Sequence, residues 1–155
     1  MIILFTILQN IMSFLIQDMR SLRYAKFTGD GGILMLTESI ADATNFEAIS
    51  EDDNPTHLAL QVKGTENVLE NSPISGVILV NKYQNDESQK WKINLMQDGN
   101  LQIVQNDEFY MYFEISLSSF KTAKKVPSFS KGFRLITDDG SRQWPNHILT
   151  QHKWL

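Results

Sequence analysis

Histidines and aspartates are among the side chains of this sequence that could support acid–base catalysis or bind a metal ion. The three histidines are His57, His147 and His152, and no predicted helix aligns the last two for a zinc site. Five aspartates lie in polar turns, and none of them fits the D-x-[DN]-x-[DN]-G pattern of a calcium loop: Asp52, Asp53, Asp98, Asp138 and Asp139. Because G-x-S-x-G, phosphate-loop and H-E-x-x-H motifs are also missing, we expect no metal, no cofactor and no enzymatic activity.

A basic and aromatic stretch lies near the end of the chain. Its members are Lys121, Lys124, Lys125, Lys131, Phe120 and Phe129. We interpret it as a solvated loop, with contact to an anionic ligand or a membrane surface as the alternative. The whole chain carries a formal charge of -4, which gives no electrostatic drive towards a phosphate backbone. We therefore expect no nucleic-acid partner.

The chain contains no cysteine, which excludes a disulfide framework and a thiolate metal site. This fits a reducing compartment, although secreted proteins can also lack cysteine. The location therefore stays open between the cytoplasm and secretion without disulfides.

Residues 1–19 form an apolar N-terminal segment that we place outside the domain. Its apolar run is shorter than the roughly 20 residues that cross a bilayer, and no basic residue precedes it as in a secretory signal. It either packs on the core or lies upstream of a later start at Met12, so that residues 1–11 would not belong to the mature protein. A signal-like role or a membrane contact through residues 1–17 is the alternative, and we expect no other membrane contact.

Beyond residue 20, apolar residues alternate with polar ones, as in half-buried strands. Residues 58–62, 90–95 and 109–117 show this alternation, and the last run would turn Ile115 and Leu117 towards the core. Turns such as Asp98-Gly99-Asn100 separate the runs, and residues 38–48 are the one helix-like stretch here. Many short strands with turns between them predict a single all-β domain over residues 20–155.

Two segments of the chain align without gaps. Residues 32–36 fall on residues 76–80 at an offset of 76 − 32 = 44 residues. A third copy is expected near residue 120, and the best candidate, residues 132–136, arrives late. The pattern predicts an imperfect internal repeat.

Residues 58–103 resemble one repeat of the ricin-type β-trefoil lectin family. Four elements come in the family's order: Leu60-Gln61-Val62, the apolar residues 77–80, the signature Gln89-Lys90-Trp91, and Asp98-Gly99. The resemblance is weaker elsewhere, since residues 24–49 lack the Gln-x-Trp signature. It implies an all-β β-trefoil of three pseudo-repeats, with Trp91 in the core.

The resemblance also implies where a sugar would bind. The family uses an acidic residue in the Leu-x-Val element, an aromatic platform, and an Asn-Gln pair before the tryptophan. The matching positions here are Gln61, Tyr83, Ser88 and Gln89, and Asn81 is a further polar contact. An amide at Gln61 would bind sugar hydroxyls more weakly than a carboxylate.

We therefore expect a non-catalytic, ricin B-type lectin-like module whose partner is a glycan or glycoprotein. The alternative is a protein-interaction or protease-inhibitor-like trefoil that has lost sugar binding. A small hydrolase built on a β-sandwich has no motif in its favour.

Overall fold

The computed structural model describes residues 13–29, 32–50, 54 and 56–137. This part of the chain is all-β, with twelve strands, three short 3-10 helices and no α-helix. None of its helices has the length and apolar character needed to span a membrane. The strands are β1 (Phe14–Asp18), β2 (Tyr24–Phe27), β3 (Leu34–Thr37), β4 (Phe46–Ile49), β5 (Ala59–Val62), β6 (Asn67–Asn71), β7 (Ile78–Lys82), β8 (Lys92–Leu95), β9 (Leu101–Gln105), β10 (Phe109–Glu114), β11 (Ser119–Ala123) and β12 (Phe133–Thr137), and the 3-10 helices are η1 (Ile40–Asp42), η2 (Glu87–Gln89) and η3 (Ile115–Leu117).

Six of the strands pair in an order that returns to its start. β1 pairs with β12 and β4, β4 with β5, β8 with β9, and β9 with β12, all antiparallel. The link between β5 and β8 is the bridge of Leu58 and Trp91, which exchange two backbone hydrogen bonds of 2.8 Å. The order β1-β4-β5-β8-β9-β12 therefore forms a ring.

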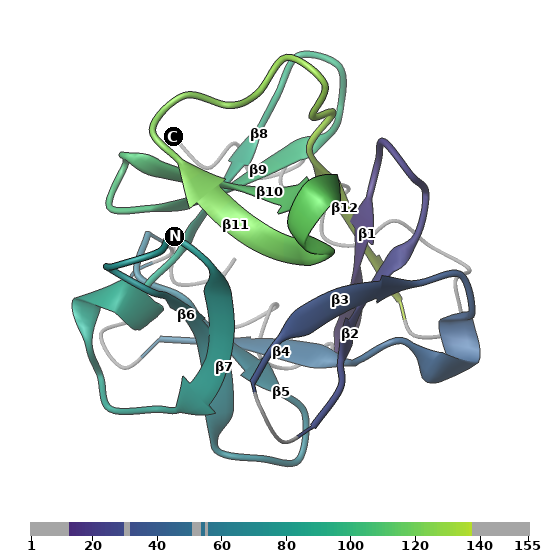
Figure 1. The fold of residues 1–155 in the computed structure, drawn as a ribbon. Helices are drawn as coiled ribbons and strands as arrows, with labels where there is room; N and C mark the ends of the chain where they lie inside the picture. Colours follow the sequence, from purple (N-terminus) through teal and green to yellow (C-terminus); the bar gives the residue numbers. More distant parts are fainter. Residues whose placement is uncertain (1–12, 30–31, 51–53, 55, 138–155) are drawn as a thin grey trace.

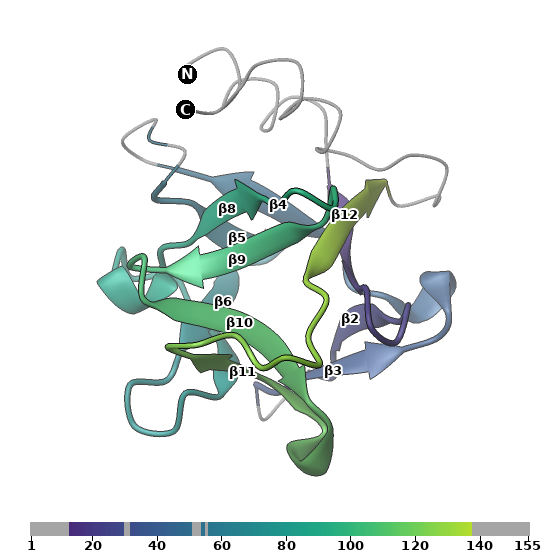
Figure 2. The same ribbon diagram turned by 90° about the horizontal axis from the view of Figure 1, so that it is seen from above.

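The other six strands form three hairpins, β2–β3, β6–β7 and β10–β11. Figure 1 shows β3, β7 and β11 around one centre, and bridges join Ile33 to Leu79 and Val77 to Lys121. In the view of Figure 2, the ring strands β4, β5, β8 and β9 lie in the upper part, and β3, β10 and β11 lie below them. The hairpins therefore cover one end of the ring.

A left-handed residue precedes the second strand of each hairpin. These residues are Gly32 (φ 68), Gly76 (φ 72) and Ser118 (φ 49). A Cβ on Gly76 would lie only 3.3 Å from the Thr122 carbonyl oxygen, so both the backbone angle and the close approach favour glycine there. The alignment of residues 32–36 with residues 76–80 is confirmed, and the third copy starts at Ser118, close to the expected position.

Residues 132–136 were the wrong choice for that third copy. They contain β12, a ring strand that pairs with β1, rather than the second strand of a hairpin. A glycine followed by apolar residues is the local pattern of both kinds of strand, so the pattern alone does not distinguish them.

The hydrophobic core lies inside the ring and against the inner faces of the hairpins. Trp91 is fully buried, and its indole Nε1 donates to the Leu69 carbonyl oxygen at 3.0 Å. Phe46 and Phe133, the first residues of β4 and β12, correspond to Trp91, which directly precedes β8, and both are also buried. The prediction that Trp91 is a core residue is confirmed.

The expected domain boundary after residue 19 needs correction for residues 14–18. These residues form β1, which pairs along its whole length with β12, and Phe14, Leu15 and Ile16 are buried. Their continuous apolar character follows from burial, which agrees with the alternative that this segment packs on the core. Residues 1–12 lie outside the described part of the chain, so the expectations about them stay predictions.

Two further expectations were wrong in detail. Strand β10 ends at Glu114, and Ile115 and Leu117 lie in η3 with more than half of their surface exposed, because the chain turns there to reach the left-handed Ser118. Residues 38–48 form only the short helix η1 before β4 begins at Phe46. Alternating burial in β4 overrides the helical preference of this segment.

Removing the indole tests the dependence of the ring on Trp91. We expect Trp91→Ala to lower the free energy of unfolding by about 3–5 kcal/mol, because a large cavity replaces a packed side chain. Trp91→Phe should cost less, since it keeps an aromatic ring but loses the bond to Leu69. Urea denaturation followed by circular dichroism measures both, and a loss below about 1 kcal/mol for Trp91→Ala would contradict this role.

Candidate functional site

Gln89 has a structural role. Its Oε1 accepts hydrogen bonds from the backbone nitrogens of Gln84 (2.9 Å) and Asp86 (3.4 Å), and its Nε2 donates to the Lys82 carbonyl oxygen (2.9 Å) and to Glu70 Oε1 (3.1 Å). The residue is 0% exposed. These bonds fasten the loop between β7 and β8, so we remove Gln89 from the candidate ligand contacts.

The other predicted polar residues near β7 bond mainly to their neighbours. Asn81 Nδ2 donates to Glu70 Oε2 at 3.0 Å. Tyr83 shares a 3.0 Å hydrogen bond with Asn85, and Lys90 Nζ lies 6.0 Å from the centre of the tyrosine ring. Glu70, which sequence reasoning missed, is the carboxylate of this group.

The five predicted residues do not surround one pocket. Gln61, on β5, donates from Nε2 to the Thr65 carbonyl oxygen. Asn81 lines one cleft and Ser88 lines another. The structure therefore divides the expected sugar site.

Three clefts occupy equivalent places between neighbouring hairpins. The arginine cleft, of about 580 Å³, lies between the β10–β11 turn and hairpin β2–β3. The asparagine cleft, of about 380 Å³, lies between the β2–β3 turn and hairpin β6–β7. The lysine cleft, of about 470 Å³, lies between the β6–β7 turn and hairpin β10–β11.

The same backbone positions line all three clefts. One hairpin contributes a residue at or just before the start of its first strand and a residue near the start of its second strand. The preceding hairpin contributes its left-handed residue and the residue five positions earlier. In the order arginine, asparagine and lysine cleft, the first-strand residues are Arg23, Asn67 and Phe109, and the second-strand residues are Met35, Leu79 and Lys121. In the same order, the left-handed residues are Ser118, Gly32 and Gly76, and the residues five positions earlier are Phe113, Phe27 and Asn71.

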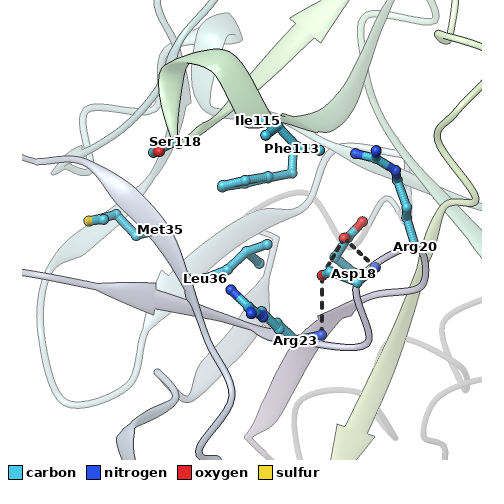
Figure 3. A pocket seen from close by; sticks show the side chains of 9 residues that line it. Asp18, Arg20, Arg23, Met35, Leu36, Phe113, Ile115 and Ser118 are labelled. Carbon is cyan, nitrogen blue, oxygen red and sulfur yellow. Dashed lines mark hydrogen bonds between the residues drawn. The ribbon is translucent and has the colours of Figure 1, made fainter.

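The polar wall of the arginine cleft is the turn between β1 and β2. Asp18 is only 4% exposed, and its Oδ2 accepts hydrogen bonds from the Ser21 backbone nitrogen (3.1 Å) and hydroxyl (2.7 Å). The Ser21 hydroxyl in turn accepts from the Arg23 backbone nitrogen at 3.2 Å. Asp18 therefore fixes the turn that carries Arg20 and Arg23, which lie on either side of it in Figure 3.

The two arginines are held at the rim of this cleft. The Arg20 guanidinium lies 4.9 Å from the centre of the Phe129 ring. Arg23 Nη2 donates to Glu38 Oε1 at 2.8 Å, with side chains 50% and 78% exposed. These exposed contacts orient the arginines but contribute little stability.

The opposite wall of the arginine cleft is apolar. Figure 3 shows the Phe113 ring beside Leu36 and Ile115, facing the arginines across the cleft. Phe113 packs edge-on against the buried Phe120, with ring centres 5.3 Å apart. The cleft thus combines a fixed aromatic ring with charged hydrogen-bond donors, an arrangement that suits a ligand with one apolar face and several hydroxyls.

Sequence reasoning missed this cleft for two reasons. Asp18 was assigned to a segment outside the domain, and Phe113 belongs to the run 109–117, whose alternate apolar residues were expected to face the core. The signal that could have found Asp18 is an aspartate followed three residues later by a serine, a spacing at which the carboxylate can accept local hydrogen bonds as Asp18 does from Ser21. No local signal indicates that Phe113, 95 positions along the chain (113 − 18), lines the same cleft as Asp18.

The described residues hold no cluster of metal-ligating side chains, and the arginine cleft is lined by a single carboxylate. No group of three or more metal-ligating side chains occurs among them. Asp18 is the one acidic residue among those that line the arginine cleft, whereas glycoside hydrolysis generally uses two carboxylates that flank the scissile bond.

Comparison with known proteins identifies similar folds. No family model matches the sequence, and no curated protein matches it. Among solved structures, the chain is similar to a GH43 β-1,3-galactosidase with a TM-score of 0.70 and 19% identity, over 86% of this chain and 28% of that one. It is similar to a designed three-fold symmetric protein, ThreeFoil, with a TM-score of 0.64 and 11% identity, over 79% of this chain and 96% of that one.

A third similar structure has a sugar bound. It is a non-toxic homologue of type II RIPs from Momordica charantia (bitter gourd) in complex with α-methyl-D-galactoside, with a TM-score of 0.62, 13% identity, and coverage of 80% of this chain and 47% of that one. At these identities the similarities show the fold alone. The chain spans less than a third of the galactosidase.

Replacing Gln89 separates a structural role from ligand binding. We expect Gln89→Ala to lower the free energy of unfolding by about 1–3 kcal/mol, because it removes the hydrogen bonds by which a buried side chain holds the loop between β7 and β8. Gln84→Ala is the matched control, since it keeps the backbone nitrogen that bonds Gln89 and removes only an exposed side chain. Thermal and urea unfolding measure both variants, and equal stability of the two would contradict the structural role.

Proposed function

We propose that this chain is a β-trefoil carbohydrate-binding module without catalytic activity, and that the arginine cleft binds the sugar. The observation that carries the proposal is the pairing of the Phe113 ring with Arg20 and Arg23 across a cleft of about 580 Å³.

Three features support the trefoil assignment. Six strands pair in a ring, and three hairpins cover one end of it. A left-handed residue recurs at the same point before β3, β7 and β11. The likeness to a designed three-fold symmetric protein extends over nearly all of that protein.

The chemistry of the arginine cleft supports a sugar as ligand. A pyranose ring has an apolar C–H face that packs on an aromatic ring, and hydroxyls that accept hydrogen bonds from guanidinium groups. Arg20 and Arg23 supply such donors, and hydrogen bonds from charged groups are the stronger ones. The fold shared with a galactoside-bound protein is consistent with this ligand class.

The absence of catalysis is part of the proposal. Asp18 already accepts two hydrogen bonds from Ser21, so its carboxylate is occupied in holding the turn. The expected role of this module is to hold a glycan near whatever acts on it or recognises it.

A protein-binding role is the second candidate. Ile74, at the tip of the β6–β7 turn, is 97% exposed, and Ile115 and Leu117 are exposed at the β10–β11 turn. Exposed apolar side chains that lie on one turn, as Ile115 and Leu117 do, are typical of a surface that contacts another protein. Saturable capture of one protein partner, unchanged by free sugars and lost in Ile74→Ser, would favour this candidate over the first.

Sugar binding in the arginine cleft is tested by a glycan array followed by calorimetry with the best neutral hit. We expect Arg23→Gln to weaken binding about tenfold or more, as for other hydrogen bonds to charged groups. Phe113→Leu should weaken it about twofold to tenfold through loss of the aromatic contact.

The matched control is Phe27→Leu, because Phe27 holds the position in the asparagine cleft that Phe113 holds in the arginine cleft. This control should leave the affinity unchanged. Equal losses in Phe27→Leu and Phe113→Leu, or no neutral glycan bound by the folded protein, would overturn the proposal.

A further inference from the structure

We propose that the lysine cleft is a second binding site, which takes the anionic group of an acidic sugar, a carboxylate or a sulfate. This inference rests on the proposed carbohydrate-binding function but concerns a different cleft and a different class of ligand.

The charge of the lysine cleft is the first observation. Lys121 and Lys124 line it, and its lining includes no acidic side chain. Lys124 forms an exposed ion pair with Glu108 at 3.2 Å. No salt bridge of the described residues involves Lys121, whose side chain passes over Gly76. The cleft therefore presents positive charge in a protein whose total formal charge is -4.

Comparison of equivalent positions gives the second observation. Where the arginine cleft has Met35 and Phe113, the lysine cleft has Lys121 and Asn71. Burial of polar groups is costly unless each finds a hydrogen-bond partner. The equivalent backbone positions of the arginine cleft carry the apolar residues Met35 and Phe113. The fold by itself therefore does not require polar residues such as Lys121 and Asn71 at these positions.

A buried hydrogen-bonded chain forms the floor of the lysine cleft. Thr122 Oγ1 donates to Asn71 Oδ1 at 2.8 Å, and Asn71 Nδ2 donates to Gln105 Oε1 at 3.1 Å. Gln105 Nε2 donates to the Glu87 carbonyl oxygen at 3.1 Å. Asn71, Gln105 and Thr122 are each less than a tenth exposed. These internal hydrogen bonds hold the floor of the cleft in one arrangement, and the groups that would bind a carboxylate or sulfate are the ammonium groups of Lys121 and Lys124.

An aromatic ring completes the lysine cleft. Phe109 holds the position of Arg23 in the arginine cleft, and Lys124 Nζ lies 6.0 Å from the centre of its ring. A sugar ring that packs on Phe109 would place a substituent near the two lysines. The basic stretch found in the sequence thus divides in the structure, since Phe120 is in the core while Lys121 and Lys124 line this cleft.

Nuclear magnetic resonance titration tests the site with four probes: a glucuronate-containing disaccharide, a sulfated disaccharide, the matching neutral disaccharide, and inorganic sulfate. We expect both acidic disaccharides to shift the backbone amides of Gly76, Lys121 and Thr122, and the neutral one to leave them unchanged. Comparison of the affinities of the two acidic disaccharides shows whether the site prefers a carboxylate or a sulfate. Raising the salt concentration should weaken binding, because exposed charges are screened.

Charge substitutions test the lysines directly. We expect Lys121→Gln to weaken binding of the better acidic disaccharide about tenfold or more, and Lys121→Arg to retain most of the affinity. The control is Lys82→Gln, which removes an exposed lysine of the neighbouring hairpin that lines none of the three clefts. Thermal unfolding confirms that each variant is folded.

The outcomes separate this inference from the proposed function. Equal losses in Lys121→Gln and Lys82→Gln, equal binding of the neutral disaccharide, or sulfate shifts that Lys121→Gln leaves unchanged would overturn the lysine cleft as a site. Neutral glycans that shift Ser21 and Arg23 would then still support the arginine cleft. A different result would be that Lys121→Gln weakens binding of acidic sugars while Phe113→Leu changes the binding of no glycan. This result would support the lysine cleft as a site and contradict the arginine cleft as one.

Discussion

Closure of the ring depends on Trp91. Its backbone and that of Leu58 exchange the two hydrogen bonds that join β5 to β8, and its indole bonds the carbonyl oxygen of Leu69 in β6. One residue thus connects two ring strands and fastens a hairpin to them. Because all three hairpins cover the same end of the ring, the spacing of the clefts between them depends on this closure.

Similar backbone geometry at the three clefts allows each to have its own chemistry. The left-handed residues Gly32 and Gly76 join one hairpin to the next, since their carbonyl oxygens accept hydrogen bonds of 2.8 Å from the backbone nitrogens of Val80 and Thr122. Ser118 holds the equivalent position in the third hairpin. Side chains at the equivalent positions then differ without disturbing the pairing, so that Met35 and Lys121 face different clefts from the same strand position. The repeated hairpins give the three clefts a similar backbone, and the different side chains at a few equivalent positions decide what each cleft can bind.

More of the fold than of the candidate site could be predicted from the sequence. The strand around Trp91, the hairpin at Asp98-Gly99-Asn100 and the offset between residues 32–36 and 76–80 were predictable, because alternation and turn residues act over a few positions. The strand Phe14–Asp18 was misplaced because a continuous apolar run looks the same in a buried strand and in a terminal segment. Among the predicted site residues, Gln89 was given a ligand role although its side chain is needed inside the protein.

The sequence by itself determined the all-β class, the core position of Trp91 and the repeat, since each depends on periodic burial and local turn chemistry. Only the tertiary structure decided which hairpins face each other across a cleft. It brought Asp18 and Phe113 to one cleft, and Asn71, Gln105 and Thr122 to another. The physical reason is that these contacts are made between strands far apart in the chain, where ring closure rather than local preference sets the distance between side chains.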